Sequence, residues 1–133
     1  MQVNTYLYFS GNCKEAFEFY AKCLGGKIDS MMSHAGTPAE QHVPAEWRDK
    51  IIHARMTIGN ELLMGSDAPP DHYARPQGFS VNLSLKDEAE ARRIYDELSR
   101  DGKITMPLGP TFWAKLFTMF VDRYGTPWMI NCE

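Results

Sequence analysis

Hydrophobic and polar positions along the chain predict a strand, a helix and three further strands in the first half. The aromatic-rich stretch VNTYLYF at residues 3–9 is typical of a strand. Apolar residues then recur every three or four positions through 13–24, which predicts one buried helix face ended by the glycines at 25–26. Asn12 and Glu15 have the spacing of a capping box at the start of that helix. Strands are expected at 27–33, 51–59 and 61–66, the last two joined by a turn at 59–60.

The second half repeats this order. A strand is expected at 79–85, a helix begins after Asp87, and strands follow at 103–108, 111–122 and 127–132. Tyr20 and Tyr95 lie 75 positions apart in the two helices, whereas Met64 and Met129 lie 65 apart near the module ends. The second offset is ten positions smaller because a long loop at 34–49 is present only in the first half.

The repeat predicts a fold of the α+β class within a single domain of residues 1–133. Module one covers about 1–66, a proline-rich connector covers about 67–78, and module two covers about 79–133. Each module has the order β-α-β-β-β. Two such modules are expected to form one cupped mixed sheet with the helices on the outside and a ligand pocket inside the cup.

Composition excludes several classes of function. Hydrophobic residues make up 44% of the chain and charged residues 23%, which is typical of a globular protein. The net charge of -3 and the lack of a dense basic cluster argue against nucleic-acid binding. No apolar run is long enough for a membrane span and the N-terminus lacks a secretion signal, so a cytoplasmic location without membrane partners is expected. Three cysteines with no C-x-x-C pair indicate reduced, buried thiols.

Several segments resemble the vicinal oxygen chelate superfamily, which includes glyoxalases, bleomycin-resistance proteins and dioxygenases, and within it the PhnB-like branch. The resemblance is carried by YLYFSGNCKEAFEFY, HARMTIGNELLMGSD and GKITMPLGPTFWAKLFTMFVDRYGTPWMIN, which span nearly the whole chain. It implies the tandem-module fold and a homodimer. Tyr6 and Tyr8, which alternate on the first strand, would suit the dimer interface.

Metal-dependent relatives in this superfamily bind a divalent cation through four side chains, mostly His and Glu. The resemblance places Thr5, Met64, Phe79 and Met129 at these positions. A hydroxyl, two thioethers and a phenyl ring do not suit zinc or harder cations, so neither a metal nor another cofactor is expected.

Candidate ligand-binding residues are those predicted to line the cup. Met and aromatic side chains suit a flat, apolar molecule, although such residues on strands are also typical of a core. His53 alternates with Arg55 and Thr57 and faces either the pocket, solvent or a partner chain. Asp67 and Asp122 are interpreted as turn-forming residues rather than catalytic acids. The full candidate set is Thr5, His53, Met64, Phe79, Met106, Trp113, Phe117, Trp128, Met129 and Asn131.

The function predicted from these residues is binding of a small, partly apolar molecule, with no catalytic residue assigned. The alternative is a metal-dependent lyase or isomerase acting on a small oxygenated substrate. Such an enzyme would hold its metal away from the usual four positions, through His53, Asp67 and Glu61.

Overall fold

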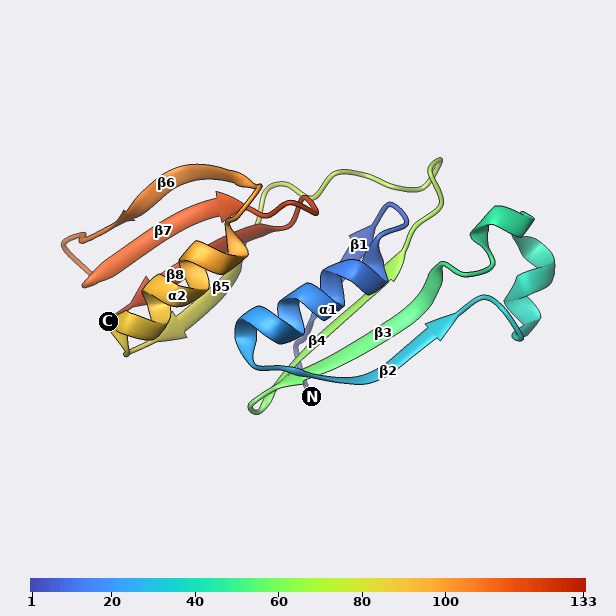
Figure 1. The fold of residues 1–133 in the computed structure, drawn as a ribbon, viewed down its shortest axis with the longest axis horizontal. Coiled ribbons are helices and arrows are strands. Elements are labelled where there is room, and N and C mark those ends of the chain that lie inside the picture. The colour runs from blue at the N-terminus through green and yellow to red at the C-terminus, as the bar shows by residue number, and fades with distance from the viewer. The chain divides into compact units, whose positions relative to one another are not determined.

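A computed structural model describes residues 1–133 and contains two compact units, Met1–Ala74 and Arg75–Glu133 (Figure 1). Each unit holds one four-stranded mixed sheet and one long α-helix, as expected for an α+β protein built from two modules. The elements of module one are β1 (Thr5–Phe9), α1 (Cys13–Leu24), β2 (Lys27–Ser33), the short 3-10 helices η1 (Pro38–His42) and η2 (Ala45–Trp47), β3 (Ile51–Ile58) and β4 (Glu61–Asp67).

The strands of module one lie in the order β1-β4-β3-β2. β1 pairs with β4 in parallel, and the other two pairings are antiparallel. Cys13, Ala16, Phe17, Tyr20 and Cys23 of α1 are buried, consistent with one helix face packing on the sheet. Gly65 of β4 permits close packing there, because a Cβ atom on it would lie 2.8 Å from Phe17 Cε1.

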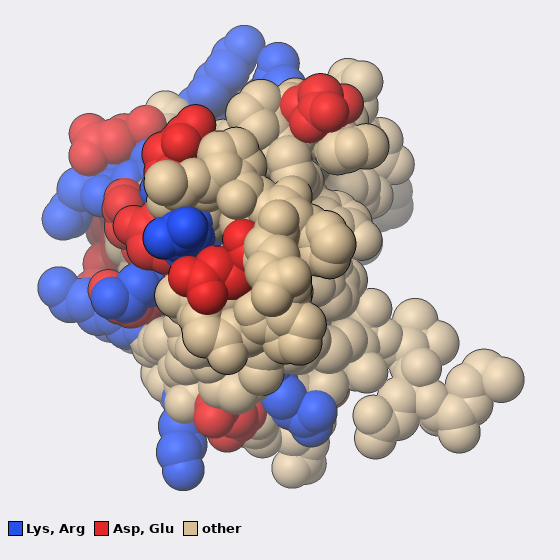
Figure 2. Space-filling view, turned by 90° about the vertical axis from the view of Figure 1, so that its right-hand side faces the viewer, with Lys and Arg blue, Asp and Glu red and all other residues tan.

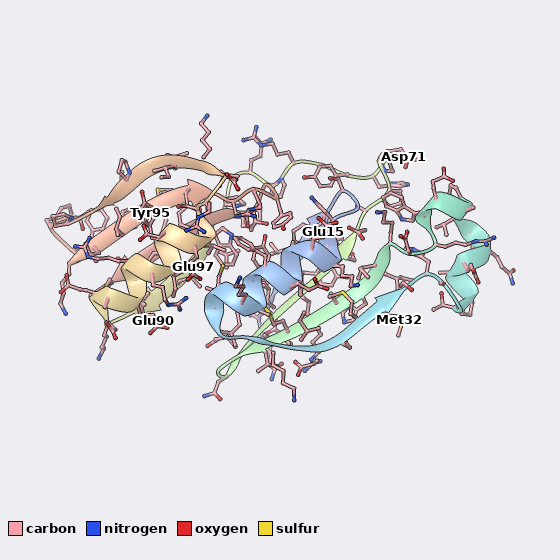
Figure 3. All side chains as sticks on the ribbon, viewed as in Figure 1. Glu15, Met32, Asp71, Glu90, Tyr95 and Glu97 are labelled. Atoms are coloured by element: carbon pink, nitrogen blue, oxygen red, sulfur yellow. The ribbon has the colours of Figure 1, made fainter.

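Module two has the same topology with β5 (Val81–Leu85), α2 (Glu88–Leu98), β6 (Lys103–Gly109), β7 (Leu116–Val121) and β8 (Pro127–Cys132). Its sheet order is β5-β8-β7-β6, again with one parallel pairing, between β5 and β8. Ala91, Ile94 and Leu98 are the buried residues of α2, and Tyr95 packs edge-on against Phe120. Figure 3 shows Tyr95 on α2 together with Glu90 and Glu97, which both pair with Arg93 on the exposed side of the helix.

Several predicted elements are corrected by the structure. The 34–49 loop contains the two short 3-10 helices, and the strand expected over 111–122 begins only at Leu116. Residues before it form a turn in which the Thr111 hydroxyl accepts from the backbone N–H of Trp113 and Ala114. The capping box at Asn12 is wrong, because no side-chain bond caps α1 there. Asp87 does cap α2, accepting from the N–H groups of Ala89 and Glu90.

Each sheet has a face that packs on its helix, here called the helix face, and an opposite face. Leu63 and Gly65 of β4 belong to the helix face of module one, and Trp128 and Ile130 of β8 to that of module two. Side chains alternate along a strand, so the residues next to these along β4 and β8 lie on the opposite face. The opposite faces therefore carry Met64 in module one, and Met129 and Asn131 in module two.

No helix of the protein is both long enough and apolar enough to cross a membrane. On the face shown in Figure 2, acidic and basic side chains are interspersed on one side, and much of the remaining surface carries no charge.

Candidate functional site

A row of three methionines crosses the opposite face of module two. Met106 of β6 pairs with Met119 of β7, which pairs with Met129 of β8, and Met129 pairs in turn with Asn82 of β5. Paired residues on neighbouring strands point to the same face, so the three thioethers lie side by side and end at an amide. Met106 and Met129 belong to the predicted set, whereas sequence reasoning missed Met119. The alternation of Phe117, Met119 and Val121 could have identified it.

The neighbouring row adds aromatic rings and one unsatisfied polar atom. Phe117 pairs with Asn131, which pairs with Ser84. Trp113 lies in the turn before β7, with its ring 5.1 Å from that of Phe117 in an edge-on arrangement. The amide nitrogen of Asn131 donates to Glu133, but its Oδ1 atom is buried with no hydrogen-bond partner. The face thus combines a soft apolar surface with a free acceptor.

A hollow of about 530 Å³ lies at the hairpin end of module two, next to the methionine row. Phe79, Met119 and Met129 line it together with Pro127 and the connector before β5. Phe79 remains 48% exposed. Trp128 also contributes to the lining, but it is 1% exposed and pairs with Val81, and its indole N–H donates to Asp122 at 2.8 Å. Its side chain therefore belongs to the core on the helix face.

The opposite face of module one is more polar. Arg55 of β3 pairs with Met64 of β4, which pairs with Tyr6 of β1. The ring of Tyr6 lies 5.1 Å from that of Tyr8 and 6.1 Å from that of His53, measured between centroids. His53 and Met64 are therefore on the same face of the sheet.

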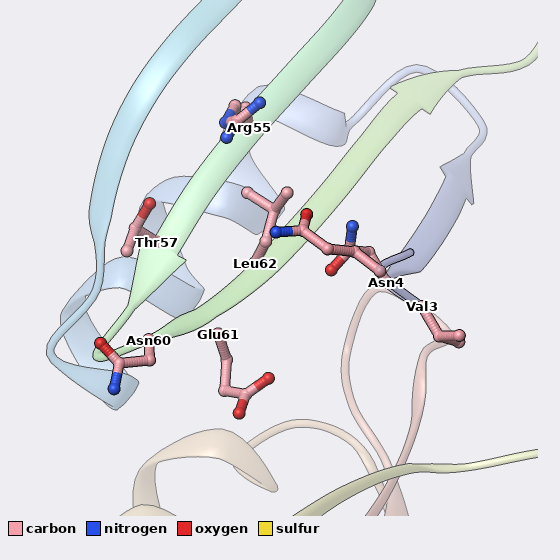
Figure 4. A pocket seen from close by; sticks show the side chains of 8 residues that line it. Val3, Asn4, Arg55, Thr57, Asn60, Glu61 and Leu62 are labelled. Carbon is pink, nitrogen blue, oxygen red and sulfur yellow. The ribbon is translucent and has the colours of Figure 1, made fainter.

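A second hollow, of about 310 Å³, lies at the hairpin end of module one (Figure 4). Its lining comes from the segment before β1, from Arg55 and Thr57 of β3, and from the turn and start of β4. The ladder registers place the two hollows at equivalent positions of the repeat. Thr5 pairs with Leu63 as Val81 pairs with Trp128, so Val3 corresponds to Phe79 and Arg55 to Met119.

The observed strand pairing changes which residues of this chain are equivalent to the metal-binding positions of relatives. Thr5 pairs with Leu63 and so lies on the helix face, whereas Tyr6 pairs with Met64. In module two the position equivalent to Thr5 is Val81, not Phe79, and Asn82 is the partner of Met129. A phenol, an amide and two thioethers still do not suit a hard or borderline divalent cation. No group of three His, Cys, Asp or Glu residues is arranged to hold a metal ion.

The alternative metal site at His53, Asp67 and Glu61 is not supported by the structure. Glu61 and Asp67 are the two ends of β4, about 20 Å apart at a rise of roughly 3.3 Å per residue. The carboxylate of Asp67 is already bound by three backbone N–H groups, from Gly11 and Cys13 at 2.9 Å and Ile51 at 2.8 Å. His53, Asp67 and Glu61 therefore cannot bind one ion together.

Both buried aspartates have structural roles. Asp67 joins the end of β4 to the start of α1 and of β3, so its partners are distant in sequence and it is not the turn residue predicted. Asp122 does form the predicted turn, accepting from the backbone of Tyr124 and Thr126. Burial, with a smaller contribution from the Asp67 charge, raises the pKa of the Cys13 thiol far above its usual range, so this thiol is not a nucleophile. All three cysteines are free and buried, as predicted.

Comparison with known proteins agrees with the duplicated topology. The model of the Glyoxalase/Bleomycin resistance protein/Dioxygenase superfamily matches residues 2–130. The chain belongs to this superfamily. It is 35% identical to protein YjdN of Escherichia coli strain K12, with 98% of this chain and 95% of YjdN covered. The superfamily resemblance predicted from the sequence is confirmed.

Solved structures share the fold over nearly the full length. Protein PA1353 from Pseudomonas aeruginosa is 46% identical with a TM-score of 0.91, covering 100% of this chain and 98% of its own. A PhnB protein from Bacillus cereus, named as a putative 3-demethylubiquinone-9 3-methyltransferase, is 24% identical with a TM-score of 0.85 and full coverage of both chains. The fosfomycin resistance protein FosX from Listeria monocytogenes is 9% identical with a TM-score of 0.65, covering 100% of this chain and 93% of its own. The likeness to these last two concerns the fold alone.

Proposed function

We propose that this superfamily member binds a small, partly apolar molecule on the opposite face of module two, without a bound metal. The observation that carries the proposal is the row of Met106, Met119 and Met129 beside the free Oδ1 acceptor of Asn131. Thioethers adapt to many ligand shapes, and a buried acceptor without a partner is costly unless a ligand donates to it. The preferred ligand is a flat or apolar molecule with at least one N–H or O–H donor.

The other predicted ligand-binding residues lie partly in module two and partly in module one. Phe117 and Trp113 extend the apolar surface beyond the methionine row, and Phe79 borders it at the hollow. Thr5, His53 and Met64 belong to module one. Of these, His53 and Met64 lie on the opposite face of the sheet, and Thr5 lies on the helix face.

A methyltransferase activity, suggested by the name of the Bacillus cereus relative, has no support in this chain. Binding of S-adenosylmethionine commonly uses a glycine-rich loop between a strand and a helix, where backbone N–H groups are free for the ligand. Here the N–H groups of Gly11 and Cys13 at the start of α1 both donate to Asp67. Two N–H groups at the start of the first helix are therefore already bound within the protein.

A thermal-shift screen of antibiotics and oxygenated metabolites tests the proposal, because a molecule that binds only the folded state raises the melting temperature. Each hit is measured again on Met119→Gln and Asn131→Leu. Both variants should weaken binding by about tenfold or more for a ligand that contacts the methionine row and the side-chain amide of Asn131. Met32→Gln is a matched control, since Met32 is 53% exposed on β2 of module one. Hits that bind both module-two variants as well as the unchanged protein would contradict the proposed site.

Metal content is tested separately on protein purified without a His-tag. Inductively coupled plasma analysis should find no stoichiometric divalent ion. Repeating the screen with Mn, Ni and Zn should leave the affinities unchanged. One bound ion per chain, or hits that require the metal, would instead favour the alternative enzymatic function.

A homodimer is also proposed, as is common among members of this superfamily. Its support is the exposure of large apolar side chains, with Phe112 at 98% and Tyr8 at 55%. Light scattering coupled to size-exclusion chromatography should give twice the mass of the chain, and Phe112→Glu or Tyr8→Glu should shift the equilibrium toward the monomer. A monomeric mass at high micromolar concentration would contradict the dimer.

A further inference from the structure

One positively charged side chain that lines the hollow of module one, that of Arg55, has no ionic partner in the protein. Arg55 is exposed on the opposite face of β3 and takes part in none of the protein's six salt bridges. Its guanidinium also makes no hydrogen bond within the protein, although its backbone pairs with β2 and β4 in the sheet. A guanidinium presents five donors in a planar fork that matches the two oxygens of a carboxylate. In a concave site, such a free fork is the feature expected of an oxyanion-binding residue.

The remaining lining of this hollow is polar and can hold a small molecule. Gln2 and Asn4 contribute amides from the segment before β1, and Asn60 contributes another from the turn. Leu62, which pairs with Thr57, gives the hollow an apolar floor. Its volume of about 310 Å³ is at the lower end of the range for ligand pockets, roughly 300–1,000 Å³.

The charges around Arg55 limit which anion can bind. Glu61 also lines the hollow, and Figure 4 shows Arg55 and Glu61 at its opposite ends with Leu62 between them. On β2, Asp29 accepts a hydrogen bond from the Thr57 hydroxyl, and Lys27 pairs with Thr57 in the ladder. The two acids balance the two bases, so the surroundings favour a singly charged anion over a doubly charged phosphate.

We propose that this hollow binds a small carboxylate through Arg55, with an ammonium or other donor group of the same molecule directed toward Glu61. Arg55 and Glu61 both line the hollow at this end of the sheet, and along β4 the backbone of Glu61 lies about 10 Å from that of Met64, the ladder partner of Arg55. A ligand that reaches both ends therefore carries its two polar groups at the ends of a short chain. This site is separate from the one proposed in module two and does not depend on it.

The test is an NMR titration of the full-length protein with pentanoate, 5-aminopentanoate and inorganic phosphate. Both carboxylates should shift the resonances of residues 2–4, 55, 57 and 60–62 and saturate in the millimolar range, with 5-aminopentanoate binding several-fold more tightly. Phosphate should bind more weakly than pentanoate. No saturable shift in this region would overturn the site. Tighter binding of phosphate would overturn its assignment to a carboxylate.

Four variants assign the roles of the charged residues. Arg55→Gln should weaken both carboxylates by about tenfold or more, and Arg55→Lys should weaken them less, because a lysine keeps the charge but loses the fork. Glu61→Gln should abolish the advantage of 5-aminopentanoate while leaving pentanoate at least as tightly bound. Arg92→Gln is the matched control, since Arg92 is exposed on α2 and lines neither hollow.

The variants also provide outcomes that overturn the proposal. Unchanged binding by Arg55→Gln with an intact amide spectrum would exclude Arg55 as the anion-binding residue. An advantage of 5-aminopentanoate that survives in Glu61→Gln would exclude the role of Glu61. Equal losses in Arg92→Gln and Arg55→Gln would show a general effect of positive charge instead of a site.

Discussion

The two modules place different chemistry at equivalent positions of one repeated backbone. Module one carries Arg55, Met64 and Tyr6 across the middle of its opposite face. At the equivalent ladder positions, module two carries Met119, Met129 and Asn82. Only the methionine of the last strand is common to both. The repeat preserves the ladder while the side chains of the opposite face have diverged, so each face is suited to a different kind of ligand group.

The modules also differ in how the start of the helix is satisfied. The N-terminus of α2 is capped locally by Asp87, whereas that of α1 is satisfied by Asp67 from the end of β4. A local cap stabilises mainly one helix, but a buried carboxylate shared by α1 and β3 holds three elements of module one together. The consequences of losing each cap should therefore differ in size.

The largest effect is expected from Asp67→Ala, which leaves three backbone N–H groups without their partner. Because those groups are bound to a buried carboxylate, we expect the free energy of unfolding to fall by about 3 kcal/mol or more. Urea unfolding measures the change. Asp71→Ala, at an exposed connector position, is the control and should change stability by less than about 0.5 kcal/mol. Equal effects of the two substitutions would contradict the role of Asp67.

Reciprocal substitutions at the equivalent positions test whether the two faces are specialised. Met119→Arg should weaken apolar ligands of module two by about tenfold, because it places a charge in the methionine row. Arg55→Met should abolish carboxylate shifts in module one and leave those apolar ligands bound. Affinities from NMR titration distinguish the two variants. Loss of both kinds of ligand in either variant would indicate that the faces do not act separately.

The buried thiol of Cys13 predicts a dependence of stability on alkaline pH. Its folded-state pKa is raised, chiefly by burial, so above about pH 8.5 the unfolded chain loses the thiol proton while the folded chain retains it. Stability from this group is complete below that pH and falls as pH rises, by up to about 1.4 kcal/mol per pH unit. Urea unfolding between pH 8 and 10 measures the slope, which should be shallower in Cys13→Ala. An identical slope in that variant would contradict the assignment.

The smallest expected effects come from the residues that precede the helices. Asp87→Ala should lower the unfolding free energy by about 1 kcal/mol, since it removes the cap of α2. Asn12→Ala should have little effect, because the Asn12 side chain makes no capping bond. Thermal unfolding of the two variants under one set of conditions makes the comparison. A larger loss for Asn12→Ala would show that the cap of α1 is assigned incorrectly.

Much of the fold follows from local pattern. The bounds of β2 and β8 agree with the sequence prediction at both ends, and the repeat of the module order is confirmed. Turn residues and helical periodicity specify these features within a few positions of the chain. The cap of α1 could not be predicted in this way, because Asp67 lies 54 residues from Cys13 and only the folded sheet brings them together.

The candidate site was predicted less completely, for a related reason. Counting along the chain assigned Thr5 and Phe79 to equivalent positions, whereas strand pairing makes Val81 the equivalent of Thr5 and places both on the helix faces. A shift of one residue reverses the face of a strand side chain, so strand register decides membership of a site. Alternation along β7 could have placed Met119 on the same face as Phe117, but its position beside Met106 and Met129 depends on strand pairing, so it was missed.

Methyl NMR of the eight methionines can show whether the opposite face of module two binds an apolar small molecule. Protein labelled with ¹³C at the methionine methyl groups is titrated with the best hit of the thermal-shift screen. Binding at this face should shift the signals of Met106, Met119 and Met129 together, with saturation at one dissociation constant, while the signal of Met56, buried in module one, stays in place. Shifts confined to the methionines of module one, or none at saturation, would contradict it.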